Sequence, residues 1–248
     1  MSRIKNRNIQ QKTPLPIVGK IRVGEKTKNN QGKEYPISLD YFKATGNYAT
    51  LFTEIYGEKP NQIQIIFITD DDKVSCHEEW EGREKKTGNL AGTSDGESFR
   101  LWNYQNERYE IFTDKDYLKK YTEEHGIQWS VILTLNFIVP KIKGVFGMWQ
   151  LQTKGTKSSI ENIINTYDSL KEHAGTICNI PFDLQVQKVT GQKPGQKRKY
   201  PVISLVPHIS AKNVEMVRNF LEGGGEINKL GMLTDEKINQ LQLNDKNE

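Results

Sequence analysis

The sequence holds little of what a disulfide-bonded scaffold, a metal centre or a membrane segment requires. Cys76 and Cys178 are the only cysteines among 248 residues, which excludes a disulfide framework. Only four histidines accompany them, so at most one sparse metal site could form. The longest apolar run, residues 131–139, is far shorter than the ~20 residues that cross a bilayer. We find no apolar segment after the basic residues near position 1, hence no secretory signal, and we expect a cytoplasmic protein.

Charge is present in quantity but unevenly placed. The net charge of +4 arises in residues 1–16, which hold four basic and no acidic side chains. Farther along, residues 70–97 hold nine acidic and four basic side chains, whereas residues 188–199 hold five basic and none acidic. Two surfaces of opposite sign would suit docking onto a charged protein or nucleic acid, although two solvated loops would produce the same pattern.

The pattern of elements predicts an α+β fold with a mainly antiparallel sheet and flanking helices. Strands arrive in hairpin-like pairs, and helices do not alternate regularly with them. We expect a disordered basic arm over residues 1–16 and an α+β domain over 17–210, with an irregular β insertion at about 74–112. Residues 211–248 should form C-terminal helices that pack on this domain or trail it.

Hydrophobic periodicity and turn residues place the elements. Strands are expected over 17–23, 62–69, 128–139, 144–152, 182–189 and 200–206, and helices over 48–55, 115–124, 158–170, 212–222 and 235–243. A hairpin is expected at residues 29–32, and Gly82, Gly88, Gly92 and Gly96 should be turns between short strands. Asn47, Asp114 and Ser210 are the expected helix caps. The order β, β, α, β, β over 128–206 could form an RRM-like or ferredoxin-like subfold.

An aspartate triplet, Asp70–Asp72, follows the isoleucine-rich strand and could present carboxylate oxygens to Mg²⁺. A two-metal site needs a further carboxylate, for which Asp95 or Glu97 can be nominated. Aspartates at strand ends are more often turn formers with solvated side chains. We therefore assign no metal ligand to the triplet.

Other catalytic and cofactor patterns are incomplete. Cys76–His77 and the pair His173 and Cys178 lack the short loop that preforms a zinc site, and adjacent residues of a strand point to opposite sides. Residues 19–27 resemble a phosphate-binding loop, but Glu25 stands where the lysine is required. No serine, histidine and acid set stands out. We assign no catalytic residue, metal or cofactor and do not expect an enzyme.

Basic residues near aromatic ones are the remaining signal. Lysines 141, 143, 154 and 157 surround a strand that carries Phe146 and Trp149, and a basic loop precedes Tyr200. Such residues could meet phosphates and stack on a base, although a core tryptophan and a flexible hairpin loop would give the same pattern. The residues assigned to nucleic-acid binding are Lys154, Lys157, Lys193, Lys197, Arg198 and Lys199.

The order and spacing of several short motifs resemble the recombination directionality factor-like proteins of phages and integrative conjugative elements. The resemblance covers residues 17–210. The motifs are Gly19–Gly24, Tyr35–Pro36, Asp40–Phe42, Tyr56–Gly57, Lys59–Pro60, the isoleucine-rich strand, Ser94–Glu97, and Gly147–Thr153 with Ser158.

The resemblance implies a non-catalytic accessory protein that binds a serine integrase on its attachment-site DNA and switches it from integration to excision. Direct contact with nucleic acid would be secondary. Two alternatives remain at this stage: a single-stranded nucleic-acid-binding protein of element replication or repair, which would use the basic loop and aromatic residues, and a Mg²⁺-dependent enzyme built on Asp70–Asp72.

Overall fold

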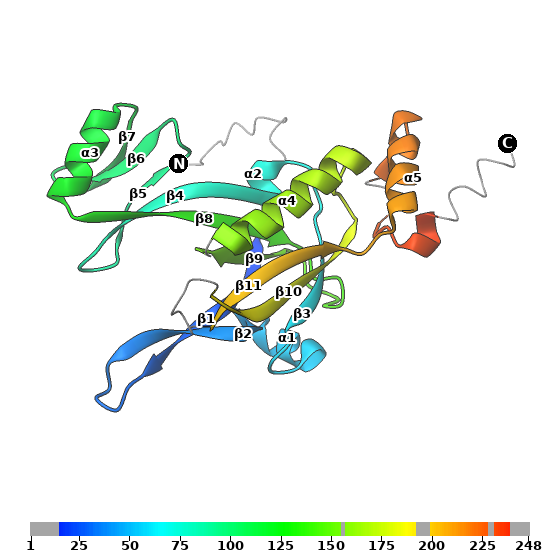
Figure 1. Cartoon of the computed structure of the whole chain (residues 1–248), viewed down its shortest axis with the longest axis horizontal. Coiled ribbons are helices and arrows are strands. Elements are labelled where there is room, and N and C mark those ends of the chain that lie inside the picture. Colours follow the sequence, from blue (N-terminus) through cyan, green and yellow to red (C-terminus); the bar gives the residue numbers. More distant parts are fainter. Residues whose placement is uncertain (1–14, 155–156, 192–198, 228–230, 239–248) are drawn as a thin grey trace, which may run out of the picture.

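The computed structural model describes residues 15–154, 157–191, 199–227 and 231–238. It has an eight-stranded, mainly antiparallel sheet, a separate three-stranded sheet and several helices, which confirms the predicted α+β class (Figure 1). The expected basic arm over residues 1–16 falls almost wholly outside the described residues. No helix in the described part of the chain is both long and apolar enough to span a bilayer.

The large sheet has the strand order β2-β1-β9-β8-β4-β5-β6-β7. Every neighbouring pair is antiparallel except β1 and β9, which run parallel. Its strands are β1 (Ile17–Lys28), β2 (Glu34–Thr45), β4 (Cys76–Glu84), β5 (Leu90–Ser94), β6 (Phe99–Asn103), β7 (Arg108–Phe112), β8 (Ile127–Phe137) and β9 (Met148–Thr153).

The small sheet is antiparallel, with the order β11-β10-β3. Its strands are β3 (Gln62–Ile66), β10 (Pro181–Thr190) and β11 (Lys199–Pro207). The helices are α1 (Ala49–Tyr56), α2 (Asp72–Ser75), α3 (Lys115–Glu124), α4 (Lys157–Ala174) and α5 (Ala211–Glu222). A further helical turn begins at residue 235, and residues 239–243 of the helix expected there lie outside the described residues.

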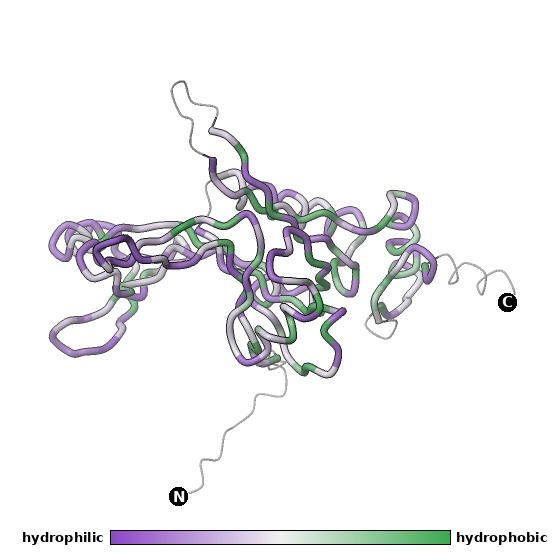
Figure 2. Tube along the Cα trace, turned by 90° about the horizontal axis from the view of Figure 1, so that it is seen from below, coloured by the Kyte–Doolittle hydropathy of each residue, from purple (hydrophilic) through white to green (hydrophobic). Residues whose placement is uncertain are grey.

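The main core collects buried side chains from both sheets and from α4, which packs against β11 and α5. A smaller cluster lies under α3 at the outer end of the large sheet, where β5, β6 and β7 extend away from α5 (Figure 1). Figure 2 shows the hydrophobic segments concentrated in the middle of the molecule. The main core includes Phe67, Leu133, Leu135, Phe137, Trp149, Ile163, Tyr167, Phe182 and Leu205; the smaller one is Ala91, Phe99, Leu101, Tyr121 and Ile127.

Two of the three expected helix caps are present. Asp114 accepts hydrogen bonds from the first-turn backbone of α3, and Ser210 does so for α5. The expectation for Asn47 is wrong: Tyr48 occupies the cap of α1 and makes no side-chain cap bond. The helix still stops at Gly57, whose φ of 85° suits glycine.

Two expectations about the sheet are wrong. The hairpins on either side of α4 belong to different sheets, because β8 and β9 lie in the large one and β10 and β11 in the small one. They therefore do not form an RRM-like or ferredoxin-like four-stranded sheet. The second wrong expectation is that Gly82 and Gly92 are turn residues: both lie within strands, unlike Gly88 and Gly96. Glycine is present at these two strand positions because the Trp129 ring packs over them, and a Cβ on Gly82 would lie 2.8 Å from that ring.

Candidate nucleic-acid interface

A cavity of about 470 Å³ lies where β1 and β9 separate. Their parallel pairing ends at Ile21 and Leu151, because β1 continues into its hairpin with β2 while β9 stops two residues later. The start of α4 and the first half of β11 close the opposite side. The cavity is lined by Lys20, Ile21, Arg22, Val23, Gly24, Ser38, Gln150, Gln152, Thr153, Lys154, Ser159, Tyr200, Pro201 and Ile203.

The described lining is cationic. It includes Lys20, Arg22 and Lys154 and no aspartate or glutamate. Lys154 forms an ion pair with Glu81, in which its Nζ lies 3.5 Å from a carboxylate oxygen. Glu81 also pairs with Arg83 at 2.9 Å. The other two cations have no ion-pair partner in the part of the chain that the structure describes. The cavity therefore favours an anion.

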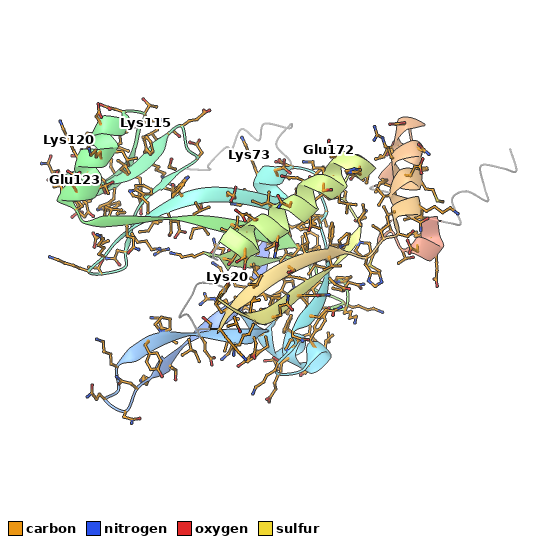
Figure 3. All side chains as sticks on the ribbon, in the orientation of Figure 1. Lys20, Lys73, Lys115, Lys120, Glu123 and Glu172 are labelled. Atoms are coloured by element: carbon orange, nitrogen blue, oxygen red, sulfur yellow. The ribbon has the colours of Figure 1, made fainter. Side chains whose placement is uncertain are left out.

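The start of α4 adds to this preference. Ser159 is buried, and its Oγ accepts a hydrogen bond of 3.1 Å from the backbone N–H of Ile203 on β11. This bond fixes the first turn of an 18-residue helix at the cavity, and the N-terminus of a helix carries a partial positive charge. Lys20 lies beside this turn (Figure 3).

The structure brings part of the predicted site together. Lys154 lines the cavity, Lys157 begins α4, and Lys199 is an exposed residue at the start of β11, next to Tyr200 in the lining. The positions of Lys193, Lys197 and Arg198 lie outside the described residues. Sequence reasoning missed Lys20 and Arg22, although their alternation with buried Ile21 is the pattern of a two-faced strand.

Two predicted neighbours do not belong to the interface. Trp149 is 1% exposed and packs against Phe52, with 5.7 Å between ring centroids, so it cannot stack on a base. Lys141 lies over the Tyr56 ring, with its Nζ 5.6 Å from the centroid, and is absent from the cavity lining. Phe146, in contrast, is exposed.

Each residue of the aspartate triplet holds the fold together. Asp70 accepts hydrogen bonds from the hydroxyl of Thr176 and the N–H of Ile177. Asp71 caps α2, and Asp72 accepts hydrogen bonds from Tyr167 and Lys171. The triplet therefore has the structural role that aspartates at strand ends usually have.

The remaining chemical patterns also have structural explanations. Cys76 and Cys178 are free and buried, and burial raises the pKa of the Cys76 thiol to about 12. No group of three or more potential metal ligands occurs among the described residues. Residues 19–27 lie in the extended strand β1, which leads into a hairpin and not a helix, and Glu25 pairs with Lys43 on β2.

Comparison with known proteins places the chain by family. The model of the Gp3-like family, described as recombination directionality factor-like, matches residues 18–208, which include the whole cavity lining. No curated protein and no solved structure gives a match. The matched region covers well over half of the 248 residues and agrees with the resemblance drawn from the motifs. The chain therefore belongs to the recombination directionality factor-like family.

Proposed function

We propose that this protein is a non-catalytic accessory factor that binds a serine integrase and directs site-specific recombination toward excision. The family match over residues 18–208 carries the proposal. The factor would bind one arrangement of the integrase synapse more tightly than another, and this difference in affinity would shift the equilibrium between them. The integrase would supply the bond-breaking and bond-forming groups.

The distribution of charge supports a protein with two kinds of partner. The cationic cavity lies between β1, β9, α4 and β11, whereas residues 76–126, which include β4 to β7 and α3, hold twelve acidic and eight basic side chains. We propose that the cavity and the neighbouring residues Lys154, Lys157, Lys193, Lys197, Arg198 and Lys199 contact phosphates of the attachment-site DNA. The acidic end remains available for protein.

The main experiment uses the purified protein with the integrase encoded on the same mobile element. Recombination is followed in separate reactions on integration substrates and on excision substrates, with and without the protein. We expect excision to occur only when the protein is present and integration to be inhibited. An unchanged ratio of the two reactions at saturating protein would refute the proposal.

A second measurement tests the DNA contact. Double-stranded attachment-site DNA is titrated with wild-type protein, the Lys20→Ala/Arg22→Ala variant and the control Lys28→Ala/Lys33→Ala, which removes two exposed lysines from the hairpin tip. Each cation that meets a phosphate adds about 1 to the slope of log affinity against log salt, so its removal should lower that slope by the same amount. We expect the first variant, and not the second, to show this decrease. Equal slopes would place the contact elsewhere.

The alternative, a single-stranded nucleic-acid-binding protein, is favoured by the partly buried Tyr200 at the cation-lined cavity. In this alternative Trp149 cannot stack on a base, because its ring is buried. This alternative predicts salt-sensitive binding of single strands without integrase, and its loss in a Lys197→Ala/Arg198→Ala/Lys199→Ala variant. The same gel-shift series with single-stranded DNA tests it.

A further inference from the structure

A second pocket lies at the acidic end of the molecule, between α3 and the turn that joins β6 and β7. Its volume is about 330 Å³, and aromatic rings form much of its lining. Lys120 of this lining projects from α3 at the outer end of the large sheet (Figure 3). The rings that matter here are those of Tyr104, Phe112, Tyr117, Tyr121 and His125.

The rings are arranged as two stacks on either side of Tyr121. Phe112 stacks on Tyr117 with 4.5 Å between centroids, and Tyr104 stacks on His125 with 4.4 Å. The Tyr121 ring lies 6.4 Å from both Tyr117 and Tyr104. The pocket, called the slot below, therefore has walls made largely of aromatic rings and is large enough to admit a side chain of a partner.

Hydrogen bonds hold these rings in place. The Tyr121 hydroxyl lies 3.2 Å from the carbonyl oxygen of Ala91 and 2.9 Å from that of Trp102, and it donates to them from the buried side of the slot. The Tyr104 hydroxyl donates to Glu84 at 2.6 Å. The slot therefore exists before any ligand arrives, which lowers the entropic cost of binding.

Two of the rings remain open to solvent despite these contacts. Tyr104 is 40% exposed and Tyr117 is 41% exposed. Exposed tyrosines beside a pocket are typical of protein interfaces, where aromatic and arginine side chains contribute most of the binding energy. The slot thus has the form of one half of such a contact.

The charges around the slot select a cation. The carboxyl of Glu84 has a lowered pKa because Thr87 and Tyr104 donate hydrogen bonds to it, so it is ionised at neutral pH. Glu124 lines the pocket, and the faces of the rings also attract positive charge. Lys120 is the single lysine or arginine in the described lining. A phosphate would meet the Glu124 carboxylate of the lining, the nearby Glu84 that bonds Tyr104, and a surrounding region with excess negative charge.

We infer that this slot is the docking site for an arginine side chain of the integrase. The guanidinium is planar and can stack on the exposed ring of Tyr117 or of Tyr104 beside the Glu124 carboxylate of the lining, which the compact ammonium of lysine does less well. This inference rests on the proposed function and adds the surface and the chemistry by which the partner is bound.

The test measures the affinity of purified integrase for four forms of the full chain. Tyr117→Ala removes one wall and should weaken binding by about tenfold. Lys120→Gln removes the competing cation and should tighten binding by about threefold. Tyr35→Ala removes an equally exposed tyrosine from β2 and should leave the affinity unchanged.

The sign of the Lys120→Gln effect distinguishes the occupants, because an anionic ligand such as nucleic acid would bind this variant more weakly. Lys120 is exposed, so the substitution does not threaten folding, and circular dichroism checks Tyr117→Ala. If wild-type protein binds integrase and redirects recombination but the Tyr117 and Lys120 variants behave as wild type, the inference is refuted and the proposed function stands. If wild-type protein does neither, the proposed function itself fails.

Discussion

Replacing Asp70 by alanine should destabilise the protein more than replacing its neighbour Asp71. Both side-chain oxygens of Asp70 accept hydrogen bonds from the Thr176 hydroxyl, at 2.9 and 2.7 Å, and Oδ1 also accepts from the Ile177 N–H at 2.7 Å. These bonds join the segment after β3 to the connection between α4 and β10. Asp71 instead makes a single local cap bond, to the N–H of Lys73 at 3.0 Å.

The size of the effect follows from what remains when the carboxylate is removed. Thr176 and Ile177 are 3% and 0% exposed, but Asp70 itself is exposed, so water can replace part of the acceptor that their donors lose. An unsatisfied buried donor costs about 1–3 kcal/mol, and bonds to a charged acceptor are the stronger ones. We expect Asp70→Ala to lower the free energy of unfolding by about 2 kcal/mol. Loss of the Asp71 cap should cost about 1 kcal/mol.

Urea unfolding followed by tryptophan fluorescence measures both variants, with and without millimolar Mg²⁺. Asp70→Asn, which keeps one acceptor oxygen, should fall between wild type and the alanine variant. Equal midpoints for the Asp70 and Asp71 variants would refute the argument from hydrogen bonds. A stabilisation of wild type by Mg²⁺ that is abolished in Asp70→Ala would instead indicate that the triplet binds metal.

Two further predictions concern the backbone and the acidic end. Gly147→Ala should lower the melting temperature by several degrees, because φ is 153° and a Cβ would lie 2.2 Å from a methyl of Val18. Thermal unfolding measures this effect. Gly144→Ala is the milder comparison, since a Cβ there, at a φ of 79°, meets open space. Hydrogen bonds from Asn103 and Arg108 lower the pKa of Glu110 to about 2. The stabilising contribution of Glu110 is therefore present above pH ~4.5 and is lost as the pH falls toward 2. The stability of Glu110→Gln in acid unfolding should depend less on pH in that window, and an unchanged profile would contradict the assignment.

Much of the fold could be predicted because its signals are local. The apolar periodicity of α4 and the long β-branched run of β8 fix their type, and Asp114 and Ser210 fix where two helices begin. The assignment of hairpins to sheets could not be predicted in this way. It depends on which strands pair across long sequence separations, as in the parallel pairing of β1 with β9, and no local pattern encodes that choice.

The candidate interface was predictable only in part for the same reason. Lys154 and Lys199 belong to visibly basic segments, whereas Lys20 and Arg22 join them through the pairing of β1 with β9. The burial of Trp149 could not be predicted either, because a tryptophan beside lysines is compatible both with an exposed ring that stacks on a base and with a ring in the core. Gly19 resolves the question, since the Trp149 ring occupies the space where its Cβ would be, at 2.5 Å.

The two proposed contact regions are joined by one continuous hydrogen-bonded sheet. The cavity involves β1 and β9, the aromatic slot involves β6 and β7, and the antiparallel ladder from Cys76 opposite Leu135 to Glu84 opposite Ile127 connects the two halves. A factor that selects one arrangement of a synapse must hold its contacts at a fixed separation, because a flexible link would let both arrangements bind equally well. In the proposed role, the ladder between β4 and β8 would provide that fixed separation. The large sheet is thus the feature through which DNA contact at one end and protein contact at the other could act on the same equilibrium.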